Sequence, residues 1–195
     1  MINKTDPFEK IKNARVFHNA DVTVLFFDVV GFTKGTDNES MKNMVRSLED
    51  CISDLLWNDY NWDEDDKENH LILIPTGDGY AVGFHPIAFN HEQILKITLD
   101  LFKLIKNKNI PIRMGLAKGP VIIHNDLNER NNIFGYGINI ASRVMTVAQQ
   151  NQILIHEDLA SEINRVKKNA LIGKICFEQK IKHGEKIKVY EIVNN

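Results

Sequence analysis

Several residues and patterns that mark particular protein classes are scarce in this sequence. It has only two cysteines, Cys51 and Cys176, and two thiols in a chain of this size do not suggest the disulfide framework of a small secreted domain. No apolar run approaches the ~20 residues that cross a bilayer, and the start of the chain lacks the apolar core of a signal peptide. We therefore expect a cytoplasmic protein without a membrane segment.

A large excess of charge of either sign is also absent. The chain carries 24 Lys and Arg against 26 Asp and Glu, so it lacks the basic footprint of a nucleic-acid-binding protein. Its 195 residues, 43% of them hydrophobic, are enough for one well-buried core and few for two. We expect an N-terminal arm or short helix over residues 1–20 and one domain over residues 21–195.

An acidic residue follows an apolar run at the start of this domain. Residues 22–33 read V-T-V-L-F-F-D-V-V-G-F-T, which places Asp28 at the exit of a buried strand. An ionised carboxylate at such a position needs compensation. In the turn that follows, the backbone amides of Gly31, Phe32 and Thr33 could approach phosphate oxygens closely, because Gly31 adds no bulk.

A second acid lies fifty residues further along, in the turn P-T-G-D-G-Y of residues 75–80. Asp78 stands between two glycines, and the apolar runs on either side predict a hairpin. If Asp28 and Asp78 meet, they form a hard-oxygen site of the kind that binds Mg²⁺ or Mn²⁺ beside substrate phosphates. Taken singly, each acid is more often an ordinary cap or turn residue.

Hydrophobic spacing predicts the remaining elements. Helices are expected over residues 38–57, 89–108, 137–149 and 157–166, and strands over 70–75, 79–85, 111–118, 121–124, 152–156, 171–182 and 186–193. The polar segments 58–69 and 125–132 are interpreted as loops, and the acidic run 63–66 as solvated rather than metal-binding. This order predicts an α+β fold with helices on one face of an antiparallel sheet.

A further polar pair lies on the third predicted helix. Asn139 and Arg143 are four residues apart and therefore share a face. Ile140, Val144 and Val147 mark a different, apolar face. Taken alone, the polar pair would be interpreted as solvated surface.

Together, four ordered blocks resemble the class III nucleotidyl cyclases, which convert a nucleoside triphosphate into a 3′,5′-cyclic nucleotide and pyrophosphate. The blocks are F-F-D-V-V-G-F-T at 26–33, G-D-G-Y at 77–80, R-M-G-L-A-K-G-P-V at 113–121 and F-G-Y-G-I-N-I-A-S-R at 134–143. The resemblance implies a ferredoxin-like βαββαβ cyclase core with a C-terminal α/β extension. It also implies a homodimer with active sites at the interface, because two such domains pack head to tail in this family.

The resemblance also implies roles for individual residues. Two Mn²⁺ or Mg²⁺ ions would be held by Asp28, Asp78 and the backbone carbonyl of Val29. Asn139 and Arg143 of the other subunit would act at the ribose and at the phosphates in the transition state.

The sequence gives weaker signals for a triphosphate-binding lysine. It also leaves a non-catalytic function open. Lys182 or Lys180 could supply the lysine that the family places on the triphosphate, although the local pattern I-K-H-G-E-K departs from the usual spacing. A non-catalytic nucleotide-binding module is the alternative, but the two acids and the Asn and Arg pair are all present, which favours an enzyme. A relative of the diguanylate cyclases would need a G-G-D/E-E-F hairpin, which G-D-G-Y does not provide.

The positions that select the base match neither purine pattern of the family. Adenylate cyclases usually have Lys, and guanylate cyclases Glu, where this chain has Ile74, and the second selecting position is Asn132. Ile74 offers no hydrogen bond to a purine edge, and strand alternation puts Phe26 on the side of Asp28, where its ring could narrow the base pocket. We therefore favour UTP or CTP as substrate, as in the similar pyrimidine cyclases of bacterial antiphage defence, whose cyclic UMP or cyclic CMP triggers a separate effector protein. ATP recognised by backbone groups is the alternative.

Overall fold

The computed structural model describes residues 17–32, 37–59, 70–128, 130–166, 172–180 and 186–192. Within them, eight strands form one sheet in the order β2-β3-β1-β4-β6-β8-β7, with β5 paired to β4 outside this path. The strands are β1 His18–Val29, β2 Leu71–Pro75, β3 Gly79–Phe84, β4 Ile112–Asn125, β5 Asn131–Gly135, β6 Gln152–His156, β7 Ile172–Lys180 and β8 Lys186–Ile192. The helices are α2 Asn38–Ser53, the π-helical η1 Asp54–Asp59, α3 His91–Asn107, α4 Tyr136–Val147 and α5 Glu157–Val166.

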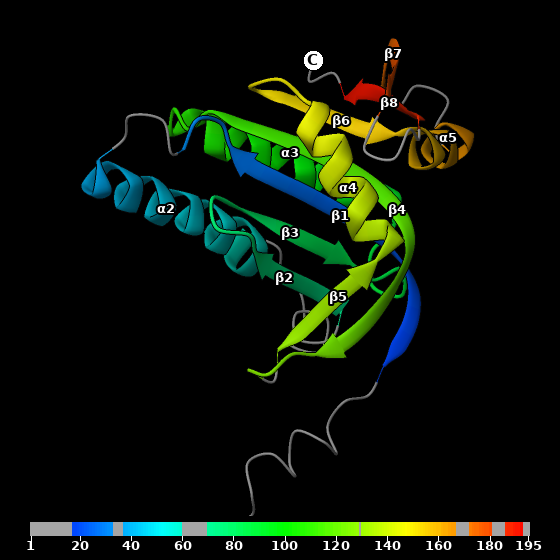
Figure 1. The fold of residues 1–195 in the computed structure, drawn as a ribbon, viewed down its shortest axis with the longest axis horizontal. Coiled ribbons are helices and arrows are strands. Elements are labelled where there is room, and N and C mark those ends of the chain that lie inside the picture. The colour runs from blue at the N-terminus through cyan, green and yellow to red at the C-terminus, as the bar shows by residue number, and fades with distance from the viewer. Residues whose placement is uncertain are drawn as a thin grey trace, which may run out of the picture.

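Strand β1 lies inside the sheet and separates two hydrophobic clusters. It pairs antiparallel with β3 on one side and with β4 on the other. Because successive side chains of a strand point to opposite faces, Leu25 and Phe27 pack in the cluster that includes α2 and α3 residues. Val22 and Val24 pack in the cluster that includes α4 residues. Figure 1 shows α4 crossing one face of the sheet while α3 lies across the other.

The predicted α+β class is confirmed, and two details of the arrangement differ. The expectation that all helices cover one face is wrong for α4, because its apolar residues Ile140, Ala141 and Val144 pack in the second cluster. Gly115 of β4 lets this helix approach so closely that an added Cβ would lie 2.7 Å from the carbonyl oxygen of Ala141. The sheet is mixed rather than antiparallel, because β4 and β6 run parallel.

Strand β4 is continuous where two separate strands were predicted. The sequence pointed to a break at Gly119-Pro120, yet Pro120 pairs with Asp21 of β1 inside the long ladder. On its other side β4 pairs with β6 only at residues 113–116 and with β5 only at residues 121–125. The proline therefore lies where the second ladder changes partner, a position at which a missing backbone donor is tolerated. Strand β5 was missed, because part of it lay in the predicted polar loop.

Helix boundaries follow local capping chemistry. Asp37 accepts hydrogen bonds from the amides of Glu39 and Ser40 and so starts α2. Asn90 and Gln93 form a reciprocal capping box that starts α3. Helix α2 ends at Ser53 and continues as η1, so the predicted helix 38–57 changes its winding near its C-terminal end.

At the N-terminus, strand β1 begins inside the segment predicted to be an arm. Residues 18–20, predicted to belong to an arm, pair with β4 as the start of β1, whereas residues 1–16 lie outside the described part. The final antiparallel pair is present as β7 and β8, and its predicted turn at 183–185 is also outside the described residues. Among the residues that can be described, no helix combines the length and apolar character that a membrane span requires.

Candidate active site

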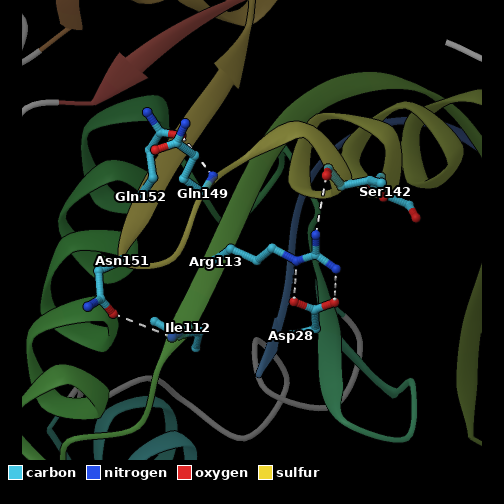
Figure 2. A network of polar contacts seen from close by, with 8 residues as sticks. Asp28, Ile112, Arg113, Ser142, Gln149, Asn151 and Gln152 are labelled. Atoms are coloured by element: carbon cyan, nitrogen blue, oxygen red, sulfur yellow. Dashed lines mark hydrogen bonds and ion pairs between the residues drawn. The ribbon is translucent and has the colours of Figure 1, made fainter. Parts of the chain in front are cut away.

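Asp28 lies near the end of β1 and is nearly buried, with 8% of the residue exposed. Arg113 stands directly opposite on β4 and forms a two-point ion pair with it, with Nε 2.7 Å from Oδ1 and Nη2 2.8 Å from Oδ2 (Figure 2). The hydrogen bonds with Asp28 raise the pKa of Arg113. Strand pairing therefore supplies the compensation that a buried carboxylate needs.

The same guanidinium also contacts α4. Its third nitrogen, Nη1, donates to the carbonyl oxygen of Thr146 at 3.2 Å, and Figure 2 shows Arg113 lying between Asp28 and this helix. Thr146 is in the last turn of α4, where carbonyl groups lack intrahelical donors. The contact indicates that Asp28 and Arg113 face the side of the sheet that α4 covers.

Asp78 is brought to the same end of the sheet by the β2–β3 hairpin. The register pairs Asp28 with Gly79, and the amide of Val29 donates to the carbonyl oxygen of Asp78 at 3.0 Å. Gly77 has φ +104° in this turn, a conformation that favours glycine. The charge of Asp78 also contributes to the raised pKa of Arg113. The two acids predicted from the sequence are therefore neighbours in the fold.

The hairpin that carries Asp78 is anchored to α2. Tyr80 packs against the α2 and α3 cluster, and its hydroxyl donates to Glu49 Oε1 at 3.1 Å. Burial and the neighbouring carboxylate raise the pKa of Tyr80 to about 12, so the hydroxyl keeps its proton. A cavity of about 130 Å³ lies between α2 and the turn, lined in part by Leu48 and Phe32.

The predicted phosphate-binding turn follows β1 directly. Gly31 has φ +75°, and apart from its chain neighbours no residue that the structure describes has an atom within 4 Å of where its Cβ would be. Phe32 packs against the α2 and α3 cluster, and the amide of Val30 is bonded to the carbonyl oxygen of Pro111 at 2.8 Å. Thr33, the third predicted member, lies outside the described residues.

Asn139 and Arg143 are positioned by the packing of α4. The apolar stripe of this helix faces the sheet, which leaves Asn139 exposed and Arg143 half-buried. They are one helical turn apart, as predicted.

This arrangement of strands and acids can be compared with known proteins. A family model described as the adenylate and guanylate cyclase catalytic domain matches residues 16–193. The chain belongs to this family. An adenylate cyclase of Mycobacterium tuberculosis is 28% identical over an alignment of 151 residues that covers 71% of this chain and 32% of that relative. The chain thus spans about a third of the length of this curated relative.

Solved cyclase structures share the fold. The adenylyl cyclase CyaB from P. aeruginosa superposes with a TM-score of 0.68 at 19% identity, covering 92% of this chain and 97% of that one. The catalytic core of a rhodopsin-guanylyl cyclase with converted specificity, in complex with ATPalphaS, gives 0.67 at 20% identity, covering 92% and 98%. These similarities confirm the cyclase core that the sequence blocks predicted.

Two of the three predicted base-selecting residues lie on the α4 side of the sheet. Phe26 and Ile74 are half-buried and pack against the cluster that contains α4 residues, which is also the face of Asp28. Asn132 lies on β5, and its side-chain oxygen accepts a hydrogen bond from the amide of Ile133 at 2.8 Å. Ile74 therefore presents only apolar surface on this face, and Asn132 uses its oxygen locally.

Class III cyclases generally use two divalent cations, and the residues at this end of the sheet fit such ions. Hard oxygen donors are supplied by the carboxylate of Asp28 and the carbonyl of Val29 on β1 and by the carboxylate of Asp78 in the neighbouring β2–β3 turn. Mg²⁺ typically takes one or two protein carboxylates together with phosphate oxygens and water. Over the described residues, no group of three or more His, Cys, Asp or Glu side chains is placed to hold a metal ion.

Arg113 is the site residue that reasoning from sequence missed. The sequence did contain a signal, since an arginine within the apolar strand Ile112–Leu116 needs a partner. That partner, Asp28, is 85 residues away and is identified only by the β1–β4 register. Lys182 lies outside the described residues, as does the side chain of Lys180, so the predicted lysine contact stays a prediction.

Proposed function

We propose that the chain is a metal-dependent nucleotidyl cyclase that converts a nucleoside triphosphate into a 3′,5′-cyclic nucleotide and pyrophosphate. The observation that carries the proposal is the pairing of β1 with β3, which sets the turn of Asp78 beside Asp28. In the reaction the ribose 3′ oxygen attacks the α-phosphorus in line. The bond from the α-phosphorus to the pyrophosphate oxygen breaks, and the hydroxyl proton is released.

The chain's own residues would bind and orient the substrate. Bound Mn²⁺ or Mg²⁺ at Asp28, Asp78 and the Val29 carbonyl would supply Lewis acidity toward the 3′ hydroxyl and the phosphates. The backbone at Gly31, which carries no side chain, would approach phosphate oxygens. Positioning and charge stabilisation would then account for most of the rate.

The second half of the site would come from a second copy of the chain. Asn139 is exposed on α4 and is therefore available to a partner, and an arginine fork suits the charge on a transferring phosphoryl group. A homodimer would then have two equivalent sites, each combining Asp28 and Asp78 of one protomer with Asn139 and Arg143 of the other.

Subunit mixing tests this arrangement. Asp28→Asn and Arg143→Ala should each be inactive as homodimers. Their mixture should regain up to half of the activity per mixed dimer, because one of its two sites is intact. The substitution to Asn preserves the shape of the buried acid beside Arg113. Absence of rescue, after labelled subunits have been seen to exchange, would contradict a shared site.

UTP or CTP is the substrate we propose. The support is the apolar surface that Phe26 and Ile74 offer on the face of Asp28, which provides no hydrogen-bond partner for a purine edge. The cyclic product would act on a separate effector protein in antiphage defence. ATP is the second candidate, because the mycobacterial relative is named an adenylate cyclase.

A single incubation distinguishes among these candidate substrates. The purified chain is given ATP, GTP, UTP and CTP at equal concentrations with Mn²⁺, and the products are identified by mass. Predominance of cyclic UMP or cyclic CMP would support the proposal, whereas predominance of cyclic AMP would refute the pyrimidine preference alone. Thermal stabilisation by non-hydrolysable triphosphates without any cyclic product would instead indicate a non-catalytic nucleotide-binding module.

A further inference from the structure

We propose that Arg113 is a latch on Asp28, so that a divalent cation binds Asp28 only after the guanidinium has released it. This inference rests on the proposed function, because it takes Asp28 to be a metal ligand. In the nucleotide-free protein, the Arg113 guanidinium would occupy the carboxylate oxygens that the metal ion would otherwise bind.

The ion pair engages both oxygens of the acid. Nε and Nη2 of Arg113 contact Oδ1 and Oδ2 of Asp28 at 2.7 and 2.8 Å, the parallel geometry of a strong fork-to-carboxylate pair. Only 11% of the Asp28 side chain is exposed. A cation that approaches these oxygens therefore meets a positive charge already bonded to them.

Two features of the fold hold the latch closed. Arg113 is opposite Asp28 in the β1–β4 ladder, so its backbone needs no rearrangement to form the pair. The bond from Nη1 to the carbonyl oxygen of Thr146 fixes the orientation of the guanidinium plane. A lysine at this position could not make the three contacts at once, because its single ammonium group has no fork.

The latch can also open. The Arg113 side chain is 29% exposed, so a change of rotamer can move the guanidinium toward solvent without disturbing the strand. A triphosphate provides anionic oxygens that can replace Asp28 as its partner. Release would then expose a carboxylate to the cation that arrives with the nucleotide.

The expected size of the effect follows from competition. If the ion pair between Arg113 and Asp28 is formed most of the time, the apparent affinity for a cation equals the intrinsic affinity multiplied by the fraction of protein in which the pair is broken. Since two charge-assisted hydrogen bonds hold the latch, we expect its removal to tighten Mn²⁺ binding by about ten-fold or more.

The test is a titration of nucleotide-free protein with Mn²⁺, followed by electron paramagnetic resonance of the free ion. Arg113→Gln removes the charge and the fork, and Arg113→Lys keeps the charge without the fork. Arg46→Gln, on the exposed side of α2, is the matched control. Arg113→Gln should bind Mn²⁺ about ten-fold more tightly than wild type, Arg113→Lys should lie between them, and Arg46→Gln should match wild type.

Three results would overturn the latch. The first is an unchanged Mn²⁺ affinity in folded Arg113→Gln. The second is a wild-type affinity in Arg113→Lys while Arg113→Gln binds more tightly, which would indicate general charge repulsion. The third is tighter Mn²⁺ binding by Arg113→Gln that persists when Asp28→Asn is added to it. Should Arg113→Gln not fold, Arg113→Lys decides alone. No nucleotide or turnover enters this measurement, so failure of the latch and failure of the cyclase activity are separate outcomes.

Discussion

The contact between α4 and β4 allows a prediction with a magnitude. A methyl group at Gly115 would lie 2.7 Å from the carbonyl oxygen of Ala141 and closer still to the backbone nitrogen of Met145. Both are backbone atoms, so the helix itself must shift. Overpacking costs ~1–3 kcal/mol, and replacing glycine recovers ~0.4–1 kcal/mol through the unfolded chain. Because a shift of backbone falls at the upper end of that range, we expect Gly115→Ala to lower the unfolding free energy by about 2 kcal/mol.

Gly83→Ala is the matched control for this substitution. A methyl group there would meet the Cδ1 atom of Ile133 at 3.1 Å, the end of a side chain that can rotate. Urea unfolding followed by circular dichroism should therefore show a change of no more than ~1 kcal/mol for the control. For a chain of this size, 2 kcal/mol corresponds to a fall in Tm of about 4–8 °C.

The result also bears on the active site. A shifted α4 changes the positions of Asn139 and Arg143, so Gly115→Ala should lower cyclase activity even at temperatures where the protein is folded. Equal unfolding free energies of Gly115→Ala and Gly83→Ala would refute the reasoning, because α4 could then move away from β4 without loss of stability.

Two further predictions concern stability. Asn90→Ala removes the side-chain oxygen that accepts from the amide of Gln93 at 3.0 Å and should cost about 1 kcal/mol in urea unfolding; Asn90→Ser should cost much less, and equal losses would argue against the cap. Burial lowers the pKa of His156 in the folded protein. The contribution of neutral His156 to the unfolding free energy is therefore complete above the unfolded pKa of about 6.5. It is lost as pH falls below that value, because the unfolded chain takes up the proton first. His156→Asn, which keeps an acceptor for the amide of Asp158, should therefore lose less stability than wild type between about pH 7.5 and pH 5.5; parallel pH profiles would contradict this.

Much of the site was predictable because its signals are local. Asp28 ends an apolar run, and Asp78 sits between glycines in a hairpin turn, so each position follows from a few neighbouring residues. The helical spacing of Asn139 and Arg143 is equally local. The family resemblance then connected these segments, and the family match and the fold confirm it.

What the sequence could not predict depends on contacts between distant strands. Arg113 meets Asp28 only through a register set by the whole β1–β4 ladder. The face on which α4 packs depends on the close approach at Gly115, which no local pattern shows. The continuity of β4 through Pro120 depends on where β5 and β6 end. Each of these follows from tertiary pairing rather than from propensity.

The alternation along β1 has a consequence for how the sequence can vary. Leu25 and Phe27 belong to one cluster, whereas Val22, Val24 and the α4 residues belong to another. Substitutions of Leu25 or Phe27 could therefore change stability without contacting the surface that Phe26 and Ile74 form on the other side. Among homologous sequences, residues of the two clusters should be substituted at different rates. The cluster on the α4 side, which faces Asp28, should change more slowly.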